Sequence, residues 1–269
     1  MPISRRLICA ATAMTLAGCA STSAPDPLTT AAAAELTPKG SLRAAINYGN
    51  PILASRGADG QPQGVSVDLA REAARRLGVA IELVSFNSAG AVVEAVKAKQ
   101  VDLAFVAIDP VRAADMEYTA PYVVIEGAYL VRNDSPLRSN DEVDRANIRV
   151  VVGRGSAYDL FLTRQIKQAS LVRAATSPAV TDLFLAQNLE VAAGVKQQLE
   201  ADAKRVGQVR LLPGRFMVIE QAMGVPKGRT TAQAWLSRYI EEMKASAFVA
   251  NALQRHKIEG AAVAPPRAP

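Results

Sequence analysis

The sequence predicts an α/β protein with two similar lobes, each containing a mostly parallel sheet flanked by helices. From Ser41 onward, short apolar runs alternate with amphipathic helical stretches, which is typical of parallel strands covered by helices. A helix-strand unit that begins at Ala91 recurs at Ala179, which favours two related halves. The chain has 269 residues, 49% of them hydrophobic, enough for one large domain or two modest ones.

The first series of elements predicts three strands separated by two helices. Its first helix ends at Gly78, the residue type preferred directly after a helix. Its last strand is apolar throughout and is expected to be buried. The expected strands are 42–48, 80–86 and 101–108, and the expected helices are 67–78 and 89–100.

The second series repeats this order. The expected strands are 147–153, 170–175, 189–195 and 209–213, and the expected helices are 156–166, 178–188 and 195–207.

Two apolar segments are expected to connect the series. Residues 118–136 are long enough to cross from one lobe to the other, and residues 216–226 have similar character and cross back. The helical stretch 230–256 then packs on the first lobe. A cleft between lobes that are joined by two crossings is a natural site for a small molecule.

The N-terminus resembles the signal peptide of a bacterial lipoprotein. A basic start precedes the apolar run 7–17, which is too short to span a bilayer. The run ends in Leu16-Ala17-Gly18-Cys19, which resembles a lipobox and implies removal of residues 1–18 and lipidation of Cys19. The alternative is an ordinary secretory signal with a chance cysteine.

Residues 19–40 are small, polar and interrupted by proline, so they are expected to form a flexible tether. Ala20 follows the cysteine where an aspartate often signals retention in the inner membrane, which favours the outer membrane for the lipid anchor.

The composition of the chain argues against several classes of function. The net charge of +6 is scattered and aromatic residues make up only 5%, so nucleic-acid binding is not expected. The only histidine is His256, which leaves nothing for Ser-His or Cys-His catalysis or for histidine metal sites. The dinucleotide fingerprint that starts at Gly153 fails because Tyr158 occupies its third glycine position. No cofactor or metal is expected, and acid/base chemistry by carboxylates stays open.

The order of several motifs resembles the bacterial extracellular solute-binding proteins that serve polar amino acid ABC transporters. Gly64 and Asp68 lead a helix, the buried strand 101–108 precedes Arg112, and the segment Tyr118-Thr119-Ala120-Pro121-Tyr122 follows. The likeness extends from Ser41 to Gly260.

The resemblance implies a two-lobed periplasmic-binding-protein fold of type II with two crossover hinges. The implied parts are lobe 1 at 41–131 plus 225–260 and lobe 2 at 132–224. The low-complexity residues 261–269 are expected to form a disordered tail.

The resemblance also implies a ligand site. In the family, the arginine after the third strand binds the ligand carboxylate, and the matching residue here is Arg112. A guanidinium offers a planar pair of donors for a carboxylate. Gly155 and Ser156 match the family's turn at a helix start, which favours an anion. The alternatives are a surface arginine and a simple helix N-cap. Tyr48 and Asn50, in the turn after the first strand, are expected to line the wall; Tyr48 could equally serve lobe packing.

The chain departs from the family where an ammonium group would bind. Residues 104–107, Ala-Phe-Val-Ala, stand where relatives carry hydroxyls, and Val195 followed by Lys196 stands where relatives carry an aspartate. Asp109 or Glu126 could replace the missing partner. Alternatively, the ligand is a plain organic acid held by Arg112 and Ser156, with Lys196 or Arg154 beside it.

The main hypothesis is a tethered, non-enzymatic and monomeric binding protein. It takes a small carboxylate-bearing solute in the periplasm and presents it to an ABC permease in the inner membrane, itself touching a membrane only through its lipid anchor. Two alternatives stay open on the same fold. One is an enzyme like cyclohexadienyl dehydratase with Glu126 as its acid, and the other is a ligand-sensing envelope protein.

Overall fold

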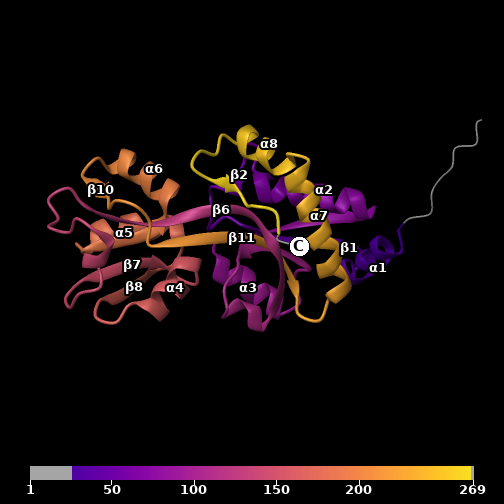
Figure 1. Cartoon of the computed structure of the whole chain (residues 1–269), viewed down its shortest axis with the longest axis horizontal. Coiled ribbons are helices and arrows are strands. Elements are labelled where there is room, and N and C mark those ends of the chain that lie inside the picture. Colours follow the sequence, from indigo (N-terminus) through magenta and orange to yellow (C-terminus); the bar gives the residue numbers. More distant parts are fainter. Residues whose placement is uncertain (1–25, 268–269) are drawn as a thin grey trace, which may run out of the picture.

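Within residues 26–267, which the computed structural model describes, ten strands form one sheet that runs through two lobes (Figure 1). The main strand order is β4-β1-β5-β11-β6-β9-β7-β8, and β10 and β12 pair on β6. The lobes therefore share a continuous sheet instead of being joined by loose linkers, and the predicted α/β fold is confirmed.

Lobe 1 is built on strand β1, which pairs in parallel with β4 on one side and β5 on the other. Gly64 leads α2 with a φ of +124°, and a β-carbon there would lie 2.4 Å from the carbonyl oxygen of Leu53, so only glycine fits. The elements are β1 Ser41–Asn47, β2 Ser55–Arg56, β3 Pro62–Gln63, α2 Val65–Leu77, β4 Ala80–Phe86, α3 Ala89–Lys97, β5 Leu103–Ala107 and the 3₁₀ turn η1 Arg112–Ala114.

Lobe 2 repeats this arrangement, with β7 paired in parallel with β8 and β9. The elements are η2 Asn140–Glu142, β7 Arg149–Gly153, α4 Ala157–Gln165, β8 Ser170–Ala174, η3 Ser177–Ala179, α5 Val180–Ala186, β9 Val191–Val195, α6 Lys196–Val206 and β10 Val209–Leu211. Each expected element of this lobe is present, with ends that differ by a few residues.

The two predicted crossings are long antiparallel strands, β6 Met116–Arg132 and β11 Met217–Pro226. In lobe 1, β11 pairs with β5, and in lobe 2, β6 pairs with β9. Figure 1 shows both strands running from one lobe into the other.

The C-terminal helical stretch packs on lobe 1 as two helices, α7 Thr230–Ala245 and α8 Phe248–Arg255, not as one. The chain turns between them at Ala247, whose φ of +59° lies in the left-handed region. No helix in the part of the chain described is both long enough and apolar enough to cross a membrane.

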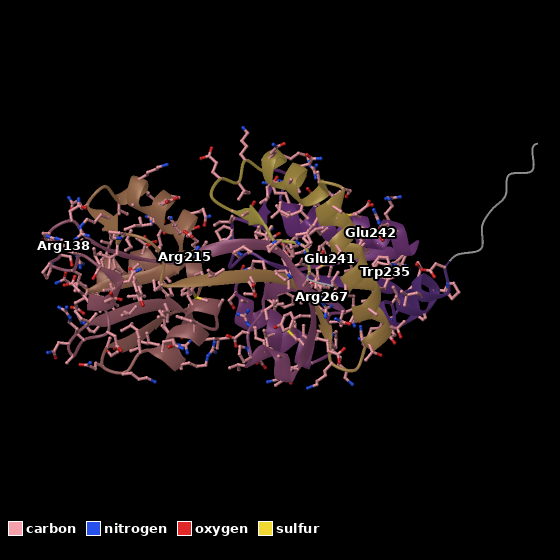
Figure 2. All side chains as sticks on the ribbon, in the orientation of Figure 1. Arg138, Arg215, Trp235, Glu241, Glu242 and Arg267 are labelled. Atoms are coloured by element: carbon pink, nitrogen blue, oxygen red, sulfur yellow. The ribbon has the colours of Figure 1, made fainter. Side chains whose placement is uncertain are left out.

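The expectation of a flexible tether over 19–40 is wrong for its second half, where Pro27–Leu36 form helix α1. This helix lies against α7 at the outer end of lobe 1 (Figures 1 and 2). Ala32 and Leu36 are buried, and the ring nitrogen of Trp235 donates to the hydroxyl of Thr29 (3.0 Å). An alanine-rich helix is stable here because α7 covers its small side chains. The predicted signal peptide and Cys19 lie outside the described residues.

The expectation of a disordered tail over 261–269 is likewise wrong for Ala262–Val263, which form β12 on the outer edge of β6. The following residue, Ala264, is buried, and its N–H donates to the carbonyl of Tyr122 (3.1 Å). Residues 262–264 are held in place because β6 has unpaired backbone groups on this side, and pairing satisfies them.

The two lobes open with the same arginine–carboxylate contact, which is buried in lobe 1 and partly exposed in lobe 2. In lobe 1, Arg43 donates to Asp102 from its backbone N–H and from Nε and Nη2 of its guanidinium; in lobe 2, Arg149 donates to Glu190 from the same three groups. Asp102 is fully buried and also accepts from Arg229 of the turn before α7 (2.8 Å). This arginine–carboxylate pair fixes the start of β1 beside the start of β5 in lobe 1, and the start of β7 beside the start of β9 in lobe 2.

Removing the carboxylate of Asp102 is expected to destabilise the protein strongly. In Asp102→Ala, the buried guanidinium of Arg43 loses its counter-charge, which costs about 3–5 kcal/mol of unfolding free energy. Urea denaturation followed by circular dichroism measures this change. The control is Asp182→Ala, which removes a carboxylate that is 65% exposed and pairs with Arg205 on the surface; it should cause little change. Equal effects of the two variants would contradict the prediction.

Candidate functional site

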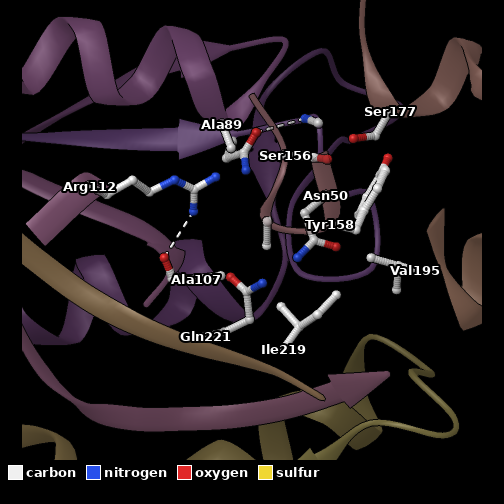
Figure 3. A pocket seen from close by; sticks show the side chains of 13 residues that line it. Asn50, Ala89, Ala107, Arg112, Ser156, Tyr158, Ser177, Val195, Ile219 and Gln221 are labelled. Atoms are coloured by element: carbon white, nitrogen blue, oxygen red, sulfur yellow. Dashed lines mark hydrogen bonds between the residues drawn. The ribbon is translucent and has the colours of Figure 1, made fainter. Parts of the chain in front are cut away.

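A small cavity lies where the two lobes meet, beside the crossing strand β11 (Figure 3). Its volume is about 30 Å³, which holds two or three water molecules at roughly 10–15 Å³ each. A larger ligand therefore enters only when the lobes stand further apart. The polar lining residues are Asn47, Asn50, Arg112, Ser156, Tyr158, Ser177 and Gln221, and the others are Gly49, Ala89, Ala107, Ala157, Val195 and Ile219.

The guanidinium of Arg112 joins the two lobes inside this site. The residue is only 2% exposed; Nη1 donates to the carbonyl of Ala107 at the end of β5 (2.9 Å), and Nη2 donates to the carbonyl of Gly155 in lobe 2 (2.8 Å). Among the described residues, its Nε has no partner although it is buried. Burial disfavours the charged form and lowers the pKa of Arg112. A buried cation with a spare donor is a site for an anion.

The short turn after β5 aims this side chain. The carboxylate of Asp109 accepts from the N–H of Val111 (2.8 Å) and so fixes the start of η1. The same carboxylate accepts from Arg164 of α4 across the lobe boundary (2.8 Å). Asp109 is thus committed to a second bridge between the lobes.

The lobe 2 wall is the turn between β7 and α4. Gly155 has a φ of +69°, and Ser156 is the N-cap of α4, its Oγ accepting from the N–H of Asp159 (3.0 Å). In return, the Asp159 carboxylate accepts from the N–H of Gly155 (2.8 Å). The next two residues, Ala157 and Tyr158, occupy the first positions of the helix and line the cavity. Their N–H groups precede any helical acceptor, and the helix dipole favours negative charge there.

The lobe 1 wall is the turn after β1. The side chain of Asn47 accepts from the N–H of Gly49 (2.9 Å) and holds the turn closed. Asn50 is 8% exposed, and among residues 26–267 no donor reaches its Oδ1. This buried acceptor lies in the cavity wall (Figure 3).

The structure brings three of the sequence-predicted residues into the cavity wall and a fourth into contact with it. Arg112, Ser156 and Asn50 line the cavity, and Gly155 meets Arg112 through its carbonyl. Tyr48 does not line it; its ring packs against the guanidinium of Arg56.

The other three predicted residues do not line the cavity, and each forms an ion pair instead: Asp109, Glu126 and Lys196. Asp109 holds Arg164, as described above. Glu126 accepts from Lys196 (3.0 Å) and from Arg215 (2.7 Å), which lies on lobe 2 (Figure 2). These two cations hold the pKa of Glu126 below its ordinary value, Lys196 having the larger effect.

Several further lining residues were not expected from the sequence, and four of them matter for the chemistry of the cavity. Tyr158 and Ser177 come from lobe 2, and Ile219 and Gln221 come from β11. Burial raises the pKa of the Tyr158 hydroxyl, which stays neutral at physiological pH. Gln221 could have been found, because it and the exposed Glu220 are the two polar residues in a crossing strand that is otherwise apolar.

Close contact between the lobes involves Gly155. A β-carbon built there would lie 3.0 Å from the Cα of Gly90 in lobe 1, so Gly155→Ala is expected to disfavour this close approach and to raise the population of molecules whose lobes stand further apart. Small-angle scattering should show a larger radius of gyration. Gly207→Ala is the matched control, since Gly207 has a similar φ of +74° but nothing within 4 Å of the added atom; it carries only the backbone strain, about 1–2 kcal/mol. The same radius in both variants would contradict this role of Gly155.

Several solved structures share this fold. The L-cysteine solute receptor of Neisseria gonorrhoeae has a TM-score of 0.74 and 22% identity, over 86% of this chain and 95% of that one. The lysine complex of an ABC transporter binding component from Wolinella succinogenes has a TM-score of 0.70 and 20% identity, over 81% and 95%. An ancestral amino acid-binding protein, a precursor of cyclohexadienyl dehydratase, has a TM-score of 0.70 and 17% identity, over 83% and 98%. At these identities the likeness shows the fold alone.

No curated protein matches the sequence at a significant level. The family model of the bacterial extracellular solute-binding proteins, family 3, matches residues 42–257, which is most of the chain and includes both lobes and the crossing strands. The chain belongs to this family of extracellular solute-binding proteins.

Proposed function

We propose that the protein is the substrate-binding component of an ABC importer and closes its two lobes on a small carboxylate-bearing solute. The observation that carries this proposal is the buried guanidinium of Arg112, which reaches both lobes and keeps one donor free. Family membership and neighbours that bind amino acids support the transport role.

A carboxylate suits this guanidinium better than the groups it now contacts. Arg112 donates to two neutral carbonyls, whereas a carboxylate accepts two parallel, charge-assisted bonds of roughly twice the strength. The N-terminus of α4, with Ser156 at its cap, then approaches the same anion from lobe 2. A ligand that contacts both lobes favours the closed state by its difference in affinity for the closed and open states.

The enzyme alternative has less support. A dehydratase needs an acidic side chain next to its substrate, and none of the residues that line the cavity in the described part of the chain carries a carboxyl group. Glu126, the candidate acid, is held ionised by Lys196 and Arg215 outside the cavity.

We further propose a monomer that acts in the periplasm beside an inner-membrane permease, with a lipid anchor at Cys19. Helix α1 begins at Pro27, so seven residues separate it from the cysteine. At about 3.5 Å per residue, a fully extended segment of this length reaches about 25 Å. The folded body would therefore stay close to the membrane.

Arg112→Gln is expected to lower carboxylate affinity about a hundredfold, because the variant keeps a polar side chain but loses the charge and the paired donors. Native mass spectrometry of protein purified from its own periplasm identifies the co-purified solute, and calorimetry then measures its affinity. Arg154→Gln is the control, since Arg154 is exposed in the neighbouring turn and does not line the cavity. Unchanged affinity in Arg112→Gln would reject the carboxylate site.

Cys19→Ser is expected to move the protein from the membrane fraction to the soluble periplasmic fraction, because the thiol that carries the lipid is gone. Immunoblots of separated fractions measure this shift. Cys9→Ser, a change within the predicted signal peptide, should leave the protein in the membrane fraction. Membrane retention of the Cys19 variant would rule out lipid anchoring at this residue.

A further inference from the structure

The cavity contains one charged side chain, that of Arg112, and no carboxylate lines it within residues 26–267. The acidic residues around it are already paired. Asp109 binds Arg164, and Asp159 binds Arg173 (3.0 Å) besides capping the turn at Gly155. None of these carboxylates is left to hold a second charge on a ligand.

The charges near the cavity therefore leave one positive charge to be neutralised. Arg112 and Arg164 are two cations, and Asp109 is the one anion between them. A ligand with a single negative charge completes the balance. An α-amino acid has no net charge, so the excess positive charge would persist, and its ammonium would lose water without gaining an anionic partner. Burying an unpaired charge is strongly unfavourable.

The remaining polar groups of the cavity are neutral. Asn50 offers a buried Oδ1 acceptor that no protein donor reaches in the described chain, and the hydroxyls of Ser156, Tyr158 and Ser177 can each donate or accept. A ligand hydroxyl would donate to Asn50 and accept from these groups without bringing a charge. The apolar lining, which includes Ile219, suits a short hydrocarbon skeleton.

Val195 stands at the end of β9, where the strand meets the cavity. A carboxylate at this position would reach the same space as the ligand and would supply the missing anion. The side chain present is apolar, and the next residue, Lys196, is turned to Glu126. The residue at position 195 therefore determines whether the cavity can neutralise the positive charge of an ammonium group.

We propose that this cavity selects a small monocarboxylate that bears a hydroxyl group and no ammonium group. The inference rests on the proposed function, because the carboxylate is the group bound by Arg112. The hydroxyl donates to Oδ1 of Asn50, and the skeleton packs against the apolar lining.

The first test compares acids that share a skeleton and differ only in hydroxyl against ammonium. Calorimetry with both enantiomers of lactate and alanine, 3-hydroxybutyrate and 3-aminobutyrate, and 2-hydroxyisocaproate and leucine measures the preference. In at least one pair, the hydroxy acid should bind tenfold or more tightly than its amino counterpart. If amino acids bind as well or better, the inference is wrong while the proposed function stands. If no acid of either kind binds, both are rejected.

The second test changes the charge balance directly. Val195→Asp should reverse the preference within a pair, since the new carboxylate can pair with the ammonium of the amino acid, whereas the hydroxy acid has no positive charge to offset the repulsion of its own carboxylate. Val195→Asn is the control, because it has the same shape without the charge and should keep the preference for the hydroxy acid. An Asp variant that still prefers the hydroxy acid tenfold would overturn the argument from charge.

Discussion

The buried guanidinium of Arg112 is the interaction on which the site depends. It is positioned by the turn at the end of β5, and it touches lobe 1 through Ala107 and lobe 2 through Gly155. Of the described residues that line the cavity, it is the one that carries a charge. The same side chain thus holds the lobes together and presents the site to a ligand. A ligand carboxylate has to compete with the carbonyls now bound, so its observed affinity includes the free energy of that exchange.

Lobe closure is supported by more than this arginine. Arg164 and Asp109 form a second bridge, and Gly155 allows the turn of lobe 2 to approach Gly90 of lobe 1. Both bridges start from residues just after β5, and the Arg112 bridge ends at Gly155 just after β7. Parallel strands leave space for a ligand at such ends. The chemistry of the site is therefore set by the ends of strands whose positions the sheet fixes.

Much of the fold could be predicted from the sequence, because its strands are short apolar runs and its main helices carry glycine or polar punctuation. The order of both lobes and both crossings is confirmed by the structure. Helix α1 was missed because its alanines show no contrast between faces, although Asp26 followed by Pro27 is a helix-start signal. The strand at Ala262–Val263 was missed because pairing with a distant edge leaves no local pattern.

The site could be predicted only in part. Three of the residues could be predicted because they stand at fixed places after strands and at a helix start: Arg112, Gly155 and Ser156. Glu126 and Lys196 were expected near the ligand; they form an ion pair with each other and do not line the cavity, and such a contact over 70 residues has no signature in sequence. Ile219 and Ser177 enter the cavity through tertiary packing alone.

The irregular pairing of β11 gives the crossing strands a further property. The register of β11 against β6 shifts on either side of Ala222, next to Gln221, which lines the cavity and pairs with Ala107 on its other side. Such irregularities bend a strand and increase its local twist. The bend in the double-stranded crossing is therefore part of the cavity wall. A solute that touches Gln221 would contact this bend directly, in addition to the surfaces of the two lobes.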